Sequence, residues 1–112
     1  MKHEESKIQK AIVTAIRYLY PKSILLAIPN EARRNVRTGA IMKAMGMLSG
    51  TSDLIFIHKG SVYFFEVKTD KGKQTDTQKE FEKRITKQGL KYFVVRSVDE
   101  VLNIIVEINT LN

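Results

Sequence analysis

The chain has 112 residues, of which 43% are hydrophobic and 28% are charged, and it contains no cysteine. This length suits a single domain over residues 1–112, and the lack of cysteine excludes disulfide bridges, cysteine-ligated zinc and a thiol nucleophile. A net charge of +7 favours a polyanionic partner, with nucleic acid first among the candidates. No apolar run approaches the roughly 20 residues of a membrane-spanning helix, so we expect a cytoplasmic protein with no membrane partner.

The first half of the chain predicts two helices and one strand. In residues 4–20 the apolar positions recur at three- and four-residue steps, which indicates an amphipathic helix ended by Pro21. Residues 23–28 predict a short buried strand. Residues 38–47 have a weaker pattern that favours a short helix.

A hairpin is expected in the middle of the chain. Two β-rich segments, residues 53–58 and 62–69, are joined by Lys59, Gly60 and Ser61. A two-residue turn at Lys59 and Gly60 would place Asp53 directly opposite Glu66.

Beyond the hairpin, the sequence predicts helix, strand and helix. Thr77 and Glu80 resemble a capping box that opens a helix ending at Gly89. Residues 92–96 predict a strand, and Ser97 is expected to cap a last helix that runs to about residue 108. The order α-β-(α)-β-β-α-β-α predicts an α/β fold in which helices flank a small mixed sheet.

Three charged residues share one face of this hairpin, namely Asp53, Glu66 and Lys68. Two opposed carboxylates would lie with their Cβ atoms about 5 Å apart and repel each other. Mg²⁺ or Mn²⁺ between them would relieve the repulsion, and Lys68 could then hold water or offset charge on a phosphate. The alternative is that Asp53 is a turn residue and that Glu66 and Lys68 form an exposed ion pair.

Basic residues precede and follow the hairpin. Between residues 32 and 52 there are four basic residues and no acidic one, which favours a segment that grips DNA phosphates over a merely solvated loop. Two lysines after the hairpin could join them. The candidates are Arg33, Arg34, Arg37, Lys43, Lys71 and Lys73.

Two strings, GTSDLIF at residues 50–56 and FFEVKTDKGKQTDTQKEF at residues 64–81, resemble the virus-type replication-repair nuclease domain, VRR-NUC. This family is a branch of the PD-(D/E)XK nuclease superfamily. The start of the first helix and residues 29–31 and 89–97 match as well, so the resemblance covers nearly the whole chain. It implies a PD-(D/E)XK restriction-endonuclease-like core of the standalone phage or bacterial type.

The resemblance also implies roles for individual residues. Asp53 and Glu66 would bind the metal, Val67 would lend its carbonyl oxygen, and Lys68 would be the catalytic lysine. Glu5 matches the acid of the first helix that completes the site, although Glu4 is nearly as well placed. Gln78 matches a glutamine of the active site, and capping of backbone groups at the end of the sheet is its alternative role.

Taken together, these features predict a Mg²⁺- or Mn²⁺-dependent DNA endonuclease that needs no small-molecule cofactor. We expect it to select duplex, branched or junction DNA by structure, in replication, repair or recombination, and to form a homodimer. One alternative is a Holliday-junction resolvase of the same superfamily. Another is a DNA-binding module without catalytic activity.

Overall fold

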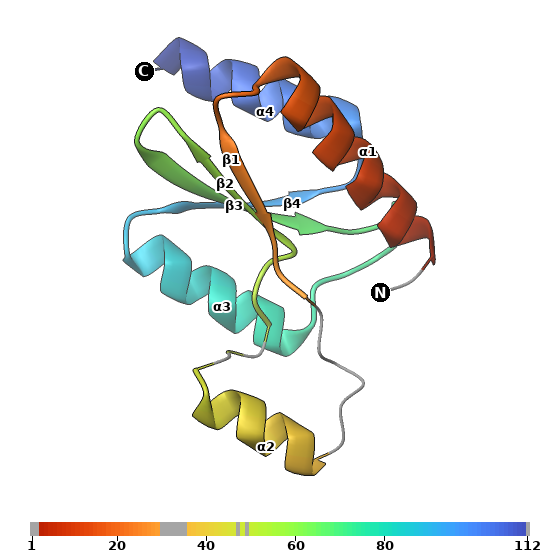
Figure 1. Ribbon diagram of the computed structural model, residues 1–112, viewed down its shortest axis with the longest axis vertical. Coiled ribbons are helices and arrows are strands. Elements are labelled where there is room, and N and C mark those ends of the chain that lie inside the picture. The colour runs from red at the N-terminus through yellow and green to blue at the C-terminus, as the bar shows by residue number, and fades with distance from the viewer. Residues whose placement is uncertain (1–2, 30–35, 47, 49, 112) are drawn as a thin grey trace.

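The computed structural model describes residues 3–29, 36–46, 48 and 50–111 (Figure 1). Its elements follow the predicted order: α1 (His3–Leu19), β1 (Ile24–Ala27), α2 (Val36–Ala44), β2 (Leu54–His58), β3 (Ser61–Val67), α3 (Asp76–Lys87), β4 (Lys91–Val95) and α4 (Val98–Leu111). Among the residues described, no helix combines the length and the apolar character needed to cross a membrane.

The four strands form one sheet in the order β1-β2-β3-β4. β1 pairs with β2 and β2 with β3 in antiparallel fashion, whereas β3 and β4 are parallel and are connected through α3. Helices α1 and α4 lie on one side of the sheet and α3 on the other (Figure 1). Helix α2 stands apart, and within the described part of the chain it packs against no other helix or strand.

The hairpin of β2 and β3 alternates between two environments. One face of it is completely buried and carries Leu54, Phe56, Phe65 and Val67. These side chains pack in one core with residues of the two helices on that side, Ile12, Ile16, Val101 and Ile105. The apolar face of the hairpin and the apolar stripes of α1 and α4 therefore form the main core of the protein.

The turn between β2 and β3 fixes the register of the hairpin. Lys59 and Gly60 both have positive φ, 51° and 80°, as a two-residue turn of the primed type requires. His58 pairs with Ser61, and each further pair along the strands follows from it. The predicted register is confirmed, and its continuation by one residue past the pair of Leu54 and Phe65 places Asp53 opposite Glu66.

The prediction of a buried strand at residues 23–28 is wrong in one respect. The strand exists as Ile24–Ala27, but only Leu25 is buried, while Ile24 and Leu26 are 53% and 46% exposed. β1 is an edge strand, and among the described helices α1 alone packs against it. An apolar sequence therefore indicated a strand correctly but not its coverage.

The predicted capping box is displaced by two residues. α3 is capped by Thr75, not Thr77, and its partner is Gln78, not Glu80. The hydroxyl of Thr75 accepts the backbone N–H of Gln78 at 3.2 Å, and the Gln78 side-chain oxygen accepts the N–H of Thr75 at 2.9 Å. Because threonine and glutamine also make a capping box, the earlier pair starts the helix. At α4 the prediction is confirmed, since Ser97 accepts the N–H of Glu100.

Candidate active site

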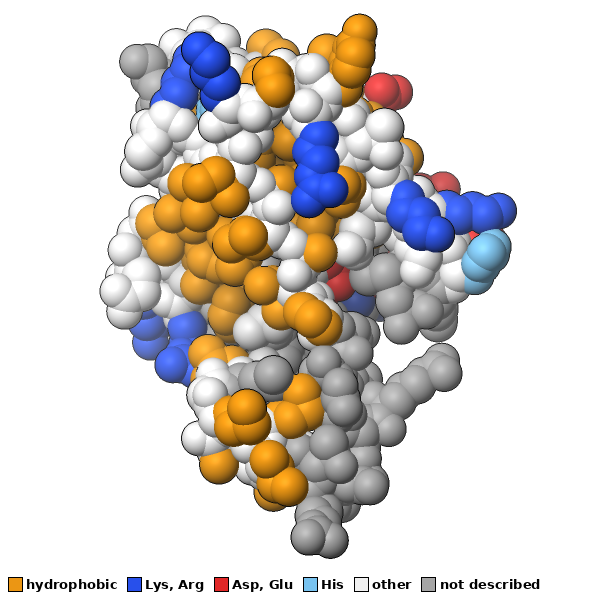
Figure 2. All heavy atoms as spheres, viewed as in Figure 1, with side chains coloured by type: hydrophobic (Ala, Val, Ile, Leu, Met, Phe, Trp, Pro, Cys, Tyr) orange, Lys and Arg blue, Asp and Glu red, His pale blue; other side chains and the backbone are white. Residues whose placement is uncertain are grey.

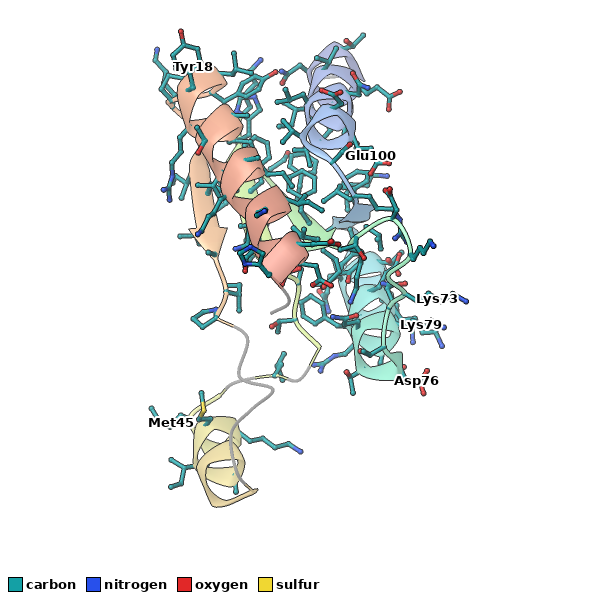
Figure 3. The ribbon with its side chains drawn as sticks, turned by 90° about the vertical axis from the view of Figure 1, so that its right-hand side faces the viewer. Tyr18, Met45, Lys73, Asp76, Lys79 and Glu100 are labelled. Atoms are coloured by element: carbon teal, nitrogen blue, oxygen red, sulfur yellow. The ribbon has the colours of Figure 1, made fainter. Side chains whose placement is uncertain are left out.

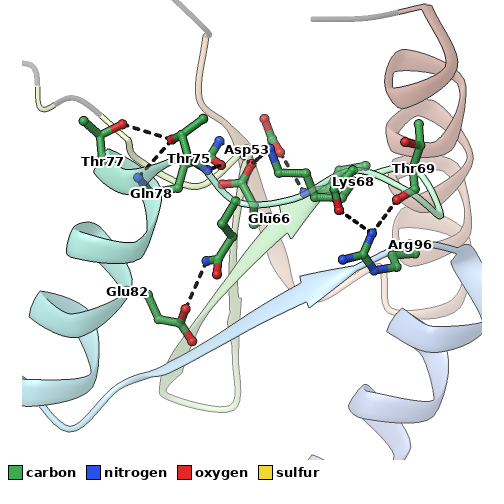
Figure 4. A network of polar contacts seen from close by, with 12 residues as sticks. Asp53, Glu66, Lys68, Thr69, Thr75, Thr77, Gln78, Glu82 and Arg96 are labelled. Carbon is green, nitrogen blue, oxygen red and sulfur yellow. Dashed lines mark hydrogen bonds and ion pairs between the residues drawn. The ribbon is translucent and has the colours of Figure 1, made fainter.

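Asp53, Glu66 and Lys68 meet at one end of the sheet, where β2 begins and β3 ends (Figure 4). Their exposed fractions are 8%, 2% and 8%. Burial of ionisable side chains is costly unless other groups compensate them. The interpretation of Glu66 and Lys68 as an exposed ion pair is therefore wrong.

Asp53 is held from both neighbouring strands. Its carboxylate oxygen Oδ2 accepts the backbone N–H of Val67 at 2.7 Å. Its backbone carbonyl accepts the N–H of Ile28 at 2.8 Å, which extends the pairing of β1 with β2 by one residue. Asp53 is thus anchored by its backbone to β1 and by its side chain to β3.

The carboxylate of Glu66 is contacted from three directions. Oε2 accepts a hydrogen bond from the amide nitrogen of Gln78 at 3.0 Å and lies 3.9 Å from the ammonium of Lys68. Oε1 accepts a hydrogen bond from the hydroxyl of Tyr92 at 3.3 Å. These contacts fix the plane of the carboxylate at the end of β3 (Figure 4).

Glu66 is electrostatically strained. Burial, with the charge of Asp53 as the next largest cause, raises the pKa of its carboxyl from 4.5 to about 9, while Lys68 and Tyr92 act in the opposite direction. Two carboxylates in one buried place cannot both be ionised cheaply without a cation. The pair therefore has the chemistry of a site for a hard divalent cation, which prefers oxygen ligands.

Gln78 connects helix α3 to this pair. One end of its amide completes the capping box with Thr75, and the other end donates to Glu66. Gly50 supports the same junction, since it has a φ of 75° and a Cβ there would lie 2.8 Å from the backbone nitrogen of Gln78 and closer still to the carbonyl group of Thr77. Only glycine allows the segment before β2 to approach the first turn of α3 so closely.

The residues present fit a divalent cation in part. Asp53 and Glu66 supply two oxygen ligands, but within the described residues no third Asp, Glu, His or Cys completes a group that could hold a metal ion. Glu5 is half-buried in the first turn of α1 and Glu4 is exposed. The roles of both residues, and of the Val67 carbonyl, stay predictions.

Helix α1, which also carries Glu5, contains a buried polar acceptor. The side-chain oxygen Oε1 of Gln9 is buried and has no hydrogen-bond partner in the described structure. Gln9 follows Glu5 by about one helical turn. A buried amide oxygen needs a donor, and water is the simplest one.

The structure describes the predicted DNA-binding residues unevenly. Arg33 and Arg34 lie outside the described residues, and so does the side chain of Arg37. Lys43 is exposed on α2, away from the sheet. Lys71 and Lys73 are exposed on the loop after Lys68, and Lys73 points away from the sheet (Figure 3).

Neither the scan against protein-family models nor the search of curated proteins found a match. Solved structures do resemble this one. One, described as "VRR_NUC domain", is 24% identical over 93% of this chain and 96% of its own, with a TM-score of 0.66. Another, described as "VRR_NUC domain protein", is 21% identical over 96% of this chain and 88% of its own, with a TM-score of 0.75.

This chain has the VRR_NUC fold. The prediction of a small α/β fold in which helices flank a mixed sheet is thereby confirmed. Within this VRR_NUC fold, the opposed carboxylates and the lysine occupy the end of the central hairpin.

Three residues around the carboxylates were not predicted from the sequence. Tyr92 contacts Glu66, Gln74 contacts Tyr92, and Arg96 donates hydrogen bonds to the backbone carbonyls of the loop that follows Lys68. Tyr92 had one available signal, because its hydroxyl is a polar end within the otherwise apolar run of residues 92–95. Gln74 and Arg96 had none, since they lie in polar segments where most side chains are solvated.

Proposed function

We propose that this protein is a Mg²⁺- or Mn²⁺-dependent DNA endonuclease that acts in the cytoplasm in replication, repair or recombination. The observation that carries the proposal is the buried pair of Asp53 and Glu66 with Lys68 on the same face. The name VRR_NUC of the structural neighbours supports a nuclease as well.

In this proposal Asp53 and Glu66 hold the metal ion, with the carbonyl of Val67 and the carboxylate of Glu5 as further ligands. A bound Mg²⁺ or Mn²⁺ supplies Lewis acidity toward the phosphate and lowers the pKa of water. Val67 donates its N–H to Asp53, and Gln78 donates to Glu66, so both carboxylates are oriented before substrate arrives.

Lys68 has the strongest catalytic role among the protein's own groups. Its side chain is only 9% exposed, and its ammonium lies 3.9 Å from Glu66. An ammonium group that is shielded from solvent interacts strongly with the charge that develops on a phosphate. It can also donate a hydrogen bond to the attacking water. Lys68 would thus stabilise the transition state and position the nucleophile.

Basic residues would hold the DNA around this centre. Lys71 and Lys73 lie on the loop directly after Lys68, where they can reach phosphates next to the cleaved bond. We propose that the basic residues of the segment before β2 contribute as well, namely Arg33, Arg34, Arg37 and Lys43. Such contacts read backbone and shape, which suits selection of DNA by structure.

We also propose a homodimer. On the open side of the sheet, Ile24 and Leu26 are about half exposed and share a face with Ile55 and Ile57. Apolar side chains gather there and again on α2 (Figure 2). A helix of 9 residues is marginal in water without a packing partner, and a second copy could cover both surfaces. Analytical ultracentrifugation of the parent protein and of Leu26→Glu would test the homodimer. The parent should sediment as a dimer and Leu26→Glu as a monomer, and equal masses for the two would contradict the proposal.

The test of the main proposal is cleavage of a panel of DNA structures with and without Mn²⁺. Fixed four-way junctions, flaps, linear duplex and single strands would be compared. Lys68→Ala and Glu66→Ala should each reduce the rate by roughly 10²-fold to 10³-fold. Lys87→Ala, at the exposed far end of α3, is the matched control and should cleave like the parent protein.

Three outcomes separate the alternatives. Strong preference for four-way junctions would assign a resolvase instead of a nuclease with broader selectivity. DNA binding without cleavage, and without heat of Mn²⁺ binding in calorimetry, would assign a binding module and overturn the proposal. Cleavage that survives both Lys68→Ala and Glu66→Ala would show that the chemistry lies elsewhere.

A further inference from the structure

The two oxygens of Glu66 have different partners. Oε2 receives Gln78 and faces Lys68, whereas Oε1 receives the hydroxyl of Tyr92. A carboxylate held on one oxygen alone can still rotate about its own axis. A donor on the second oxygen therefore determines whether the group keeps one orientation.

A short chain of hydrogen bonds directs the Tyr92 hydroxyl. The amide nitrogen of Gln74 donates to Glu82 at 3.0 Å and lies 3.4 Å from the oxygen of Tyr92. Because a carboxylate only accepts, Glu82 turns the nitrogen of Gln74, and not its oxygen, toward this place. Tyr92 consequently accepts from Gln74, and its own hydrogen is left to point at Glu66.

The ring of Tyr92 is itself fixed by the sheet and by α3. Tyr92 lies beside Phe64 in the parallel pairing of β3 with β4, and its ring packs edge-on against Phe81 at a centroid distance of 6.2 Å. Burial, and after it the charge of Glu66, raises the pKa of the Tyr92 hydroxyl above its ordinary value. The packing of the ring and the donor from Gln74 together hold the hydroxyl beside Glu66.

We propose that Tyr92, oriented by Gln74, is a positioning residue that sets the carboxylate of Glu66 for binding a divalent cation. This inference rests on the proposed function, because it assigns Glu66 to the metal. It adds a residue of β4 and a residue of the β3–α3 loop to the machinery. Neither of them contacts the reacting atoms.

The experiment is calorimetric titration of the purified protein with Mn²⁺, for the parent and for Tyr92→Phe. Removal of the hydroxyl alone should weaken Mn²⁺ binding by about 10-fold, the lower end of the effect of outer-sphere partners of metal ligands. Cleavage at saturating Mn²⁺ should fall much less than cleavage at low Mn²⁺. Tyr63→Phe is the matched control, since Tyr63 is a buried tyrosine of the neighbouring strand β3 that faces the apolar core.

A purely structural role would give a different result. If Tyr92→Phe lowers the melting temperature without changing Mn²⁺ affinity relative to Tyr63→Phe, the proposal is overturned. Gln74→Leu supplies a second test, because it should weaken Mn²⁺ binding in the parent but add nothing in the Tyr92→Phe background. Additive losses would contradict the coupling of Gln74 through Tyr92.

The failure of this inference differs from the failure of the proposed function. A parent protein that binds no Mn²⁺ would overturn both. A parent that binds Mn²⁺ through Glu66, with an affinity that Tyr92→Phe leaves unchanged, would overturn the inference alone.

Discussion

The two faces of the β2–β3 hairpin are built from alternate residues of the same strands, yet they obey opposite rules. On the side of α1 and α4, Phe65 and Val67 are completely buried among apolar neighbours. On the side of α3, Glu66 and Lys68 are almost as deeply buried but have ionisable side chains. One face gains free energy from burial, whereas the other must offset a desolvation cost with hydrogen bonds and ion pairing.

The difference suggests a division of labour between stability and chemistry. Burial of the apolar face stabilises the fold and offsets the desolvation cost of the charged face. Proteins commonly keep destabilising groups at functional sites when the surrounding structure holds them in place. Substitutions on the two faces should therefore change stability in opposite directions.

The largest effect is expected on the apolar face. Phe65→Ala should reduce the free energy of unfolding by about 3–5 kcal/mol, because it removes a fully buried ring and leaves a cavity. Denaturant unfolding followed by circular dichroism would measure the change. Phe65→Leu, which keeps most of the apolar volume, should cost clearly less. A loss below about 1 kcal/mol for Phe65→Ala would show that this face is not the main source of stability.

On the charged face we expect the opposite sign. With a pKa of about 9 in the folded state and 4.5 as the ordinary value, Glu66 must take up a proton on folding between these pH values, so the parent loses stability as pH rises through that window. Glu66→Gln does not titrate, and without metal it should stabilise the protein by up to about 3 kcal/mol at pH 7. Thermal unfolding with a chelator at pH 5 and pH 8 would measure it, and the gain should be larger at pH 8.

A matched control separates the Glu66 effect from general loss of charge. Glu107 is exposed on α4, and Glu107→Gln should change stability by less than about 0.5 kcal/mol at both pH values. If Glu66→Gln destabilises the metal-free protein at pH 8, the carboxylate pair is not a source of strain. The contrast between the two faces would then be lost.

The smallest effect is expected at the first turn of α3, where Gln78 holds Glu66 by a hydrogen bond. Thr75→Ala removes the N-cap acceptor that bonds to Gln78 and should cost about 1 kcal/mol. It should also lower Mn²⁺ affinity slightly, since Gln78 would hold Glu66 less firmly. Thr77→Ala is the comparison, because the Thr77 hydroxyl contacts that of Thr75 at 3.1 Å but is not the N-cap acceptor of α3, so its loss should cost clearly less. Equal losses for both substitutions, measured by denaturant unfolding, would contradict the cap at Thr75.

The hairpin was predictable in detail because its register is a local property. Lys59 and Gly60 adopt the positive φ angles that a two-residue turn requires, and once the turn is fixed every pair of the hairpin follows. The juxtaposition of Asp53 and Glu66 is part of that same register. The pairing of Asp53 with Glu66 could thus be predicted from the position of the turn and the number of residues between the turn and each acid.

Other features depend on tertiary contacts that local sequence does not contain. β1 has the apolar sequence of a buried strand. Whether its side chains are buried depends on whether a helix packs over them, and among the elements described α3 does not contact β1. Thr75 and Thr77 are each followed three residues later by a capping-box partner, and the structure forms the earlier of the two boxes. Tyr92 reaches Glu66 from a strand 26 residues away along the chain.

The mixed topology of the sheet also has a kinetic consequence. Asp53 and Glu66 come together as soon as a hairpin with a two-residue turn closes, an event of about 1–10 μs in isolated hairpins. Gln78 and Tyr92 arrive only when α3 has crossed the sheet and β4 has paired in parallel with β3, which requires much longer-range contacts. We therefore expect Asp53 and Glu66 to come together during folding before Gln78 and Tyr92 reach them. The site would be complete only after β4 has paired with β3.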